Sequence, residues 1–486
     1  MSTSENMGDP LTIAVAGASG FIGRHLVSRL AEEHDVLALG RSEVDGEPWR
    51  GTSAIGRRCD LFSLKDIERA LSGTDVAFYL VHSMMPTARL TQSAFEDMDA
   101  TLADNFGRAA ARAGVKQIIY LGGLIPQNEV LSKHLESRRE VEELLGYYGV
   151  PVTVLRAGLV VGAGGSSLGM LVKLVGRLPV LICPSWTLSD TQPVALHDVV
   201  ELLARSVGRE EVLGRVFDVG GLDVLTYRAM IARTAVLMGV KRTIFEVPIL
   251  TPRLSALWVS LVTGAPRALV GPLVESLKHP MVARDDELAR VLDVPMTSFD
   301  DALSGALAAE RAAVEPPVVS SRRARPAQPS AALMPIAPRP DVRSIQRIAL
   351  PAPLDAITVT MRYMEWLPRF CRPWLRVEVD EHLVCRFSLT GTKLLLLELS
   401  YSHDRSTADR ALLYITGGLL AVVNDGDRDR LEFRVLPGGR EVLAAIHDFT
   451  PALPWFVYKL TQAPAHLVVM TAFARHLRRA GTPAMP

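Results

Sequence analysis

Three glycines separate a run of apolar residues from an amphipathic segment near the start of the chain. They stand in the sequence GASGFIG, between the strand-like run LTIAVA and a helix-like run. In this setting Gly17 permits a tight turn, Gly20 lets the backbone approach a pyrophosphate, and Gly23 allows close packing of the helix on the strand. The first N–H groups of the helix also attract an anion. The pattern predicts a dinucleotide site, with a purely structural turn as the alternative, formed by Gly17, Ser19, Gly20, Phe21, Ile22 and Gly23.

A basic residue follows the next predicted strand, VLALG (36–40). Arg41 stands where a site for NAD usually has an acidic residue that binds the ribose 2′-hydroxyl. A guanidinium pairs bidentately with a 2′-phosphate, and Arg24, just after the third glycine, adds another positive charge. We therefore expect NADP(H) rather than NAD(H) as the cofactor. A surface arginine with no ligand is the alternative.

These residues and several further stretches resemble the short-chain dehydrogenase/reductase superfamily, specifically its atypical, NmrA-like NAD(P)-binding branch. The resemblance covers about residues 11–310. It implies that Asp60 contacts the adenine, although an aspartate there also serves as a helix or turn cap. Besides the glycine motif, the resemblance rests on AFYLVHSM (77–84), Asn105, IIYLGGL (118–124), VTVLRAGLVVG (152–162) and TQPVALHDVV (191–200).

The catalytic pattern of that superfamily is altered in this chain. Active members carry a serine at the end of the fifth strand and a Tyr-x-x-x-Lys on the next helix. Gly122 and Gly123 stand at the serine position, while His134 and Arg138 align with the tyrosine and the lysine. One helical turn apart, His134 and Arg138 can together bind the nicotinamide ribose, and His134 can exchange a proton near neutral pH. A surface histidine on a polar helix is the alternative.

Further candidates follow the fourth predicted strand. His82 and Ser83 lie just beyond it, and in open α/β sheets the ligand lies outside the carboxyl ends of the strands. We predict both as pocket residues that contact the cofactor, with His82 also a catalytic candidate beside His134 and Arg138. Tyr79, on the strand itself, is predicted to belong to the core. Arg156 faces the substrate or caps the sheet.

The elements that position these residues alternate regularly. Short apolar runs and amphipathic helical runs follow one another as in LTIAVAG, FIGRHLVSRLAEE, VLALG, LKDIERALSG and VAFYLV, with a long helix around 93–113. This alternation indicates βαβ units. We predict a Rossmann-type parallel sheet with helices on both faces over 11–314, including a substrate lobe at about 194–310.

A proline-rich stretch, 315–340, separates this half from a different one. It has almost no bulky apolar residue, so we expect a linker. Beyond it, 341–486 shows paired strand patterns and a final amphipathic helix at 462–478, which predict an α+β domain with an antiparallel sheet around a long C-terminal helix. The layout weakly resembles a helix-grip (START-like) fold, which implies an apolar cavity; a small core without a ligand is the alternative.

Composition narrows the class of protein. The 486 residues fit two to four domains, and 53 basic against 53 acidic residues leave no global field for nucleic acid or an anionic membrane. The four cysteines include no pair at Cys-x-x-Cys spacing, so they indicate neither a disulfide framework nor a zinc ribbon. The polar tail at 1–10 does not read as a signal peptide, and no run is long enough to span a bilayer. We expect a cytoplasmic protein without a metal site.

These features lead to one leading function and two rivals. The leading hypothesis is an NADPH-binding atypical short-chain reductase that acts on a small apolar carbonyl or enone-type compound. The altered catalytic residues favour a rival, a non-catalytic NADP(H) sensor or scaffold whose C-terminal domain binds an apolar ligand or a partner. A carrier that holds a lipid or polyketide in its C-terminal domain is the third hypothesis.

Overall fold

The computed structural model of the chain divides into two compact units. Unit 1 comprises Met1–Met84 and Asp99–Met334, and unit 2 comprises Met85–Met98 and Pro335–Pro486. The described residues are 9–41, 52–83, 88–127, 130–247, 252–314, 339–423 and 429–480. Most of the expected linker, 315–338, lies outside them, while Arg339 and Pro340 already begin a strand. The membership of residues 85–98 in unit 2 has no counterpart in the sequence patterns.

Unit 1 is built on a seven-stranded parallel sheet, which confirms the predicted α/β fold. Hydrogen-bonded neighbours follow the order β12-β7-β6-β4-β1-β2-β3. The strands are β1 (Thr12–Ala16), β2 (Asp35–Gly40), β3 (Ile55–Arg58), β4 (Val76–Tyr79), β6 (Gln117–Gly123), β7 (Val152–Ala157) and β12 (Val216–Val219).

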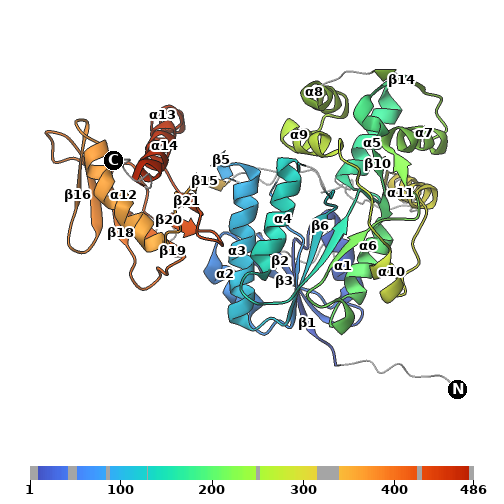
Figure 1. Cartoon of the computed structure of the whole chain (residues 1–486), viewed down its shortest axis with the longest axis horizontal. Coiled ribbons are helices and arrows are strands. Elements are labelled where there is room, and N and C mark those ends of the chain that lie inside the picture. Colours follow the sequence, from blue (N-terminus) through green and yellow to red (C-terminus); the bar gives the residue numbers. More distant parts are fainter. Residues whose placement is uncertain are drawn as a thin grey trace, which may run out of the picture. The chain divides into compact units, whose positions relative to one another are not determined.

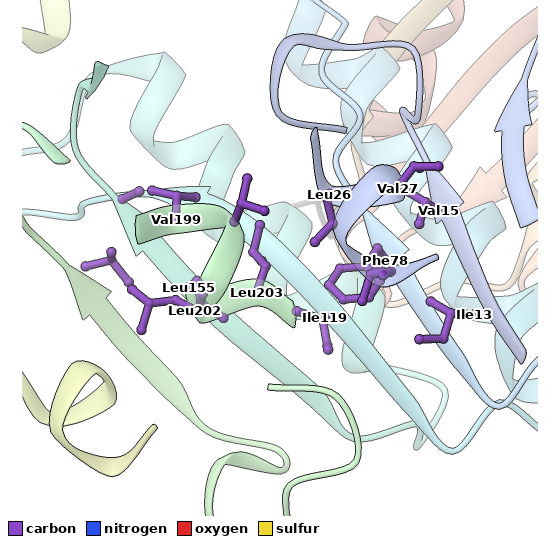
Figure 2. Close-up of a cluster of buried hydrophobic side chains, with 14 of the residues drawn as sticks. Ile13, Val15, Leu26, Val27, Phe78, Ile119, Leu155, Val199, Leu202 and Leu203 are labelled. Atoms are coloured by element: carbon purple, nitrogen blue, oxygen red, sulfur yellow. The ribbon is translucent and has the colours of Figure 1, made fainter. Parts of the chain in front are cut away.

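Helices cover both faces of this sheet (Figure 1). One face carries α1 (Phe21–Leu30), α6 (Leu196–Arg205) and α10 (Glu287–Val291), and the other carries α2 (Leu64–Leu71), α3 (Phe95–Ala113) and α4 (Lys133–Gly146). The central strands are apolar along their whole length because both faces are buried. Figure 2 shows how Val15 and Phe78 from the sheet meet Leu26 of α1 and Leu203 of α6, all inaccessible to solvent.

A smaller lobe of unit 1 has its own apolar core. Leu168 and Val175 pack there with Tyr227 and Phe299. From the sequence we expected this lobe to start at about residue 194. Its core also includes earlier residues. Its elements are β8 (Val160–Val161), α5 (Ser166–Arg177), β9 (Val180–Pro184), β10 (Asp190–Thr191), β11 (Val194–Ala195), β13 (Leu225–Thr226), α7 (Tyr227–Leu237), β14 (Thr243–Val247), α8 (Pro252–Thr263), α9 (Arg267–Ser276) and α11 (Phe299–Val314).

Unit 2 contains the predicted antiparallel sheet, in the order β16-β17-β18-β19-β20-β21-β15-β5. Its eighth strand, β5, comes from the segment between β4 and α3 and pairs in parallel with β15. The other seven strands run antiparallel to their neighbours. The eight strands are β5 (Ala88–Gln92), β15 (Arg339–Ala349), β16 (Leu375–Val379), β17 (Val384–Leu389), β18 (Leu395–Tyr401), β19 (Arg410–Gly417), β20 (Arg430–Val435) and β21 (Glu441–Phe449).

Among the described residues of unit 2 the structure has three further helices, two more than the sequence indicated: α12 (Ala356–Phe370), α13 (Trp455–Leu460) and α14 (Gln462–Ala480). Tyr363 of α12 and Phe473 of α14 meet with ring centroids 5.0 Å apart, and both pack against Phe433 of β20. This aromatic group is the centre of an apolar core between the helices and one face of the sheet. None of the described helices combines the length and the apolar character that a membrane span requires.

The core position of Phe473 generates a stability prediction. Phe473→Ala removes a fully buried ring, so we expect the free energy of unfolding of unit 2 to fall by about 3–5 kcal/mol. Val468→Ala, on the same helix but 60% exposed, serves as the control and should change it by less than about 0.5 kcal/mol. Calorimetric unfolding of the full-length variants makes the comparison. Equal effects of the two substitutions would contradict the packing of α14 on the sheet.

Candidate functional site

The glycine loop lies at the point where the order of the parallel strands reverses. From β1 the chain continues to β2 on one side, whereas β4 lies on the other, and open α/β sheets bind their ligands beyond the carboxyl ends of the strands at such a point. Gly17 has φ +89°, and a Cβ atom there would lie 2.9 Å from the carbonyl oxygen of Leu80. A Cβ atom on Gly23 would lie 2.2 Å from the carbonyl oxygen of Gly17. Only glycine fits at these two positions.

The start of α1 is open to an anion. Gly20 is the N-cap residue and no side chain caps the helix. Ser19 and Gly20 are exposed, whereas Phe21 and Ile22 are half-buried and Gly23 is buried. The backbone N–H of Gly20 donates to the carbonyl of Gly17 over 2.9 Å, which fixes the turn and leaves the next N–H groups at the helix terminus. This cradle of backbone donors without side chains fits a pyrophosphate.

The other predicted nucleotide contacts have different surroundings. Arg41 is exposed and directly follows β2, at the same carboxyl edge as the glycine loop. Arg24 lies on the first turn of α1, with Nη2 3.4 Å from the carbonyl oxygen of Ala163. Asp60 is buried, and its Oδ1 accepts the N–H of Phe62 over 3.2 Å. Asp60 therefore caps a local turn, and its contact with an adenine stays a prediction.

A buried carboxylate organises the neighbouring strand end, that of β4. Asp99, on α3, accepts the backbone N–H of Ser83 over 2.8 Å and forms an ion pair with Arg138 of α4. His82 Nδ1 lies 3.2 Å from Asp99 Oδ2 and 2.8 Å from Arg138 Nη2. The side chains of Asp99 and Arg138 are 1% and 6% exposed, while that of His82 is 30% exposed. Of this cluster, only His82 reaches solvent to a substantial extent.

Contacts of opposite kind meet at Nδ1 of His82. The guanidinium of Arg138 can only donate to this nitrogen, whereas the carboxylate of Asp99 can only accept from it, so the two contacts favour different tautomers. Burial, and then the charge of Arg138, lower the pKa of His82, which favours the neutral imidazole. The shorter contact, to Arg138, favours the tautomer with the ring proton on Nε2. In that tautomer His82 has an N–H donor on Nε2.

His134 lies beside His82 on the first turn of α4, with ring centroids 5.3 Å apart. Burial, followed by the charge of Arg138, lowers the pKa of His134 to about 3. A group with this pKa is neutral at physiological pH and does not act there as an imidazolium acid. This argues against the proton exchange near neutral pH that we expected from its sequence position.

Packing at the end of β6 explains why glycine stands at the position of the usual catalytic serine. A Cβ atom on Gly122 would lie 3.0 Å from the ring of Tyr120, so a serine at this position crowds that ring. The hydroxyl groups of Tyr120 and Tyr79 are buried. Tyr79 is thus a core residue, as predicted. Arg156 is held by Glu142 through contacts of 2.9 and 2.5 Å.

The sequence interpretation missed Asp99. It expected a helix around 93–113 but assigned no role to the acidic residues of its first turns, Glu96, Asp97 and Asp99. The available signal was an acidic helix start directly after the strand that carries His82. The structure brings together His82, Ser83, Arg138 and His134, and it places the glycine loop at the adjacent strand end.

Comparison with known proteins agrees with this geometry. Residues 13–178 match the NAD dependent epimerase/dehydratase family. The chain is 30% identical to the auxiliary protein GraX of Staphylococcus aureus over 29% of its own length and only 42% of that protein. It is 29% identical to the ceramide reductase of Caulobacter vibrioides over 49% of its own length and 73% of that protein.

A solved structure supports the fold of unit 1. The NADPH-dependent quinone oxidoreductase QOR2 of Escherichia coli, in complex with NADPH, aligns with 60% of this chain and 98% of its own, with a TM-score of 0.50 and 20% identity. At this identity the likeness shows the shared fold alone.

The lowered pKa of His134 generates a prediction for stability against pH. Its folded-state pKa of about 3 lies below its usual 6.5, so the unfolded chain binds the proton first as the pH falls. The stability that this lowered pKa gives the folded protein is fully present above about pH 6.5. As the pH falls below 6.5, that stability is lost progressively, by at most ~1.4 kcal/mol per pH unit. His134→Asn should therefore flatten the loss of stability between about pH 6.5 and pH 4.

Urea unfolding across that pH range measures the effect. His382→Asn is the matched control, because the His382 side chain is 82% exposed. If the two variants lose stability with the same slope as the parent protein, His134 is not a buried neutral imidazole.

Proposed function

We propose that this protein is an NADPH-dependent reductase of a small apolar carbonyl or enone-type compound, because residues 13–178 match the NAD dependent epimerase/dehydratase family and the chain is similar to a ceramide reductase. The observation that carries the proposal is the pair of adjacent strand ends, those of β1 and β4, at the point where the strand order reverses. The glycine loop follows one of them and His82 follows the other. The relation to a ceramide reductase supports reduction as the reaction.

The residues present fit a dinucleotide. The backbone of Gly17, Gly20 and the first turn of α1 would hold the pyrophosphate, since side chains at the glycines would fill the space. Arg41 would pair with a 2′-phosphate, with Arg24 as a nearby second charge, which favours NADP(H) over NAD(H). When bound, the reduced nicotinamide supplies a hydride.

The chain's own residues then have a defined task. Hydride addition at a carbonyl carbon, or at the far carbon of an enone, places negative charge on the oxygen. The Nε2–H of His82 donates a hydrogen bond to that oxygen and stabilises the charge. Arg138 and Asp99 act as positioning residues, because they hold the histidine neutral and oriented. A neutral imidazole is a poor acid, so water delivers the final proton to the product.

A non-catalytic NADP(H) sensor is the second candidate. The residues at the usual serine, tyrosine and lysine positions are Gly122, His134 and Arg138, and the pKa of His134 excludes it as a strong acid at neutral pH. Binding without turnover distinguishes this candidate from the reductase.

The choice of cofactor yields a binding prediction. The parent protein should bind NADPH more tightly than NADH, and Arg41→Ala should weaken NADPH binding by about tenfold to a hundredfold, the value of a charge-assisted pair to phosphate. NADH binding should change little. Isothermal titration measures both, with Arg69→Ala as a control because Arg69 is an exposed arginine on α2, 73% accessible. Equal affinity of the parent protein for both nucleotides contradicts the role of Arg41.

Catalysis is tested at His82. His82→Phe should lower the rate of NADPH oxidation by about 10²- to 10³-fold, as expected for the loss of a donor to a developing oxyanion, with little effect on nucleotide affinity. His82→Gln keeps an N–H at a similar reach and should retain more activity. His197→Phe, an exposed histidine of α6, is the control. If NADPH binds but no carbonyl or enone in a broad panel is reduced, the sensor is the correct function.

A further inference from the structure

One end of the sheet in unit 2 exposes large apolar side chains that its core does not use. Trp374 is 79% exposed, Phe456 is 69% and Leu460 is 75%. Isolated exposed apolar residues are ordinary, whereas several together mark an interaction surface. We name this surface the apolar end and define it by Trp374, Leu389, Leu394, Leu419, Phe456 and Leu460.

Backbone hydrogen bonds show that these residues belong to one end. The N–H of Thr390 donates to the carbonyl of Trp374, and the N–H of Leu389 donates to that of Leu394 across the turn between β17 and β18. The N–H of Leu419 donates to the carbonyl of Leu395 at the start of β18. Four strand ends, those of β16, β17, β18 and β19, therefore meet there.

The same end continues to α13. The N–H of Val422 donates to the carbonyl of Thr450, and the N–H of Ala452 donates to that of Leu420. These bonds attach the segment after β19 to the segment that leads into α13. Phe456 and Leu460 lie four residues apart on that helix and so share one face.

The segments of this end that the structure describes carry charges of one sign. The segments that form it are 369–375, 389–395, 417–423 and 452–460, and they contain no aspartate or glutamate. They contain four basic residues, all exposed: Arg369, Arg372, Lys393 and Lys459. The neutral total charge of the chain therefore conceals a local positive surface.

From this combination we propose that the apolar end of unit 2 docks on a membrane surface that carries anionic headgroups. Exposed Trp, Phe and Leu side chains enter the boundary between headgroups and acyl chains, and tryptophan favours that boundary. Arginine and lysine around them are attracted to anionic lipids. Four exposed cations beside these apolar side chains complement a negatively charged bilayer.

Vesicle sedimentation of the full-length protein tests the proposal. The protein should bind vesicles of phosphatidylcholine mixed with phosphatidylglycerol, bind pure phosphatidylcholine weakly, and be released from the mixed vesicles by high salt. Trp374→Ala and Lys393→Glu should each lower partitioning onto mixed vesicles by roughly tenfold. The controls are Phe245→Ala, which removes a 57% exposed aromatic of unit 1, and Lys241→Glu, which reverses an exposed charge there.

The outcomes are distinct. Binding that the two apolar-end variants lose and the controls keep supports membrane docking. No binding to mixed vesicles, or equal binding by all variants, overturns it. If light scattering shows a dimer that Trp374→Ala converts to a monomer, the apolar end is instead an interface between two copies of the chain, and the proposal is wrong.

Discussion

The candidate site depends on the interactions of the Asp99 carboxylate. It joins three elements at one point: the loop after β4 through the N–H of Ser83, the helix α3 that carries it, and α4 through Arg138. A buried guanidinium without a carboxylate costs several kcal/mol, so this pairing is required once Arg138 is buried. The orientation of His82 follows from it, since both Asp99 and Arg138 contact its Nδ1. The chemistry proposed for this site therefore rests on a contact that does not touch the substrate.

The parts of the site that the sequence predicted are local. The glycine motif and its flanking strand and helix lie within about twenty consecutive residues, so spacing alone implies the turn and the helix start. Asp99 and Arg138 are 39 residues apart, and no periodicity in a single sequence indicates that they meet. The protonation of His134 was also inaccessible, because its pKa depends on burial and on a neighbouring charge that only the folded chain supplies.

The same distinction holds for the fold. The alternation of strands and helices in unit 1 and the paired strands and final helix of unit 2 follow from hydrophobic patterns, and the structure confirms both fold classes. The sequence interpretation missed the helix α12 and the strand β5, whose places in unit 2 depend on contacts with segments far along the chain. The apolar end is assembled from four separate segments, so neither the total charge nor any single segment indicates it.

The pairing of β5 with β15 has a consequence for the synthesis of the chain. The side chain of Gln346, on β15, donates a hydrogen bond to the backbone carbonyl of Gln92, on β5, 254 residues earlier in the chain. The ribosome therefore synthesises β5 long before its partner β15. Until β15 is made, the edge of β5 has no native strand to pair with, and such an edge is open to pairing with other chains. Closing so long a loop also slows the completion of the sheet. A gene fragment that starts at the beginning of β15 encodes seven of the eight strands. Recombination that exchanges the C-terminal half alone would therefore separate β5 from its own partner strand.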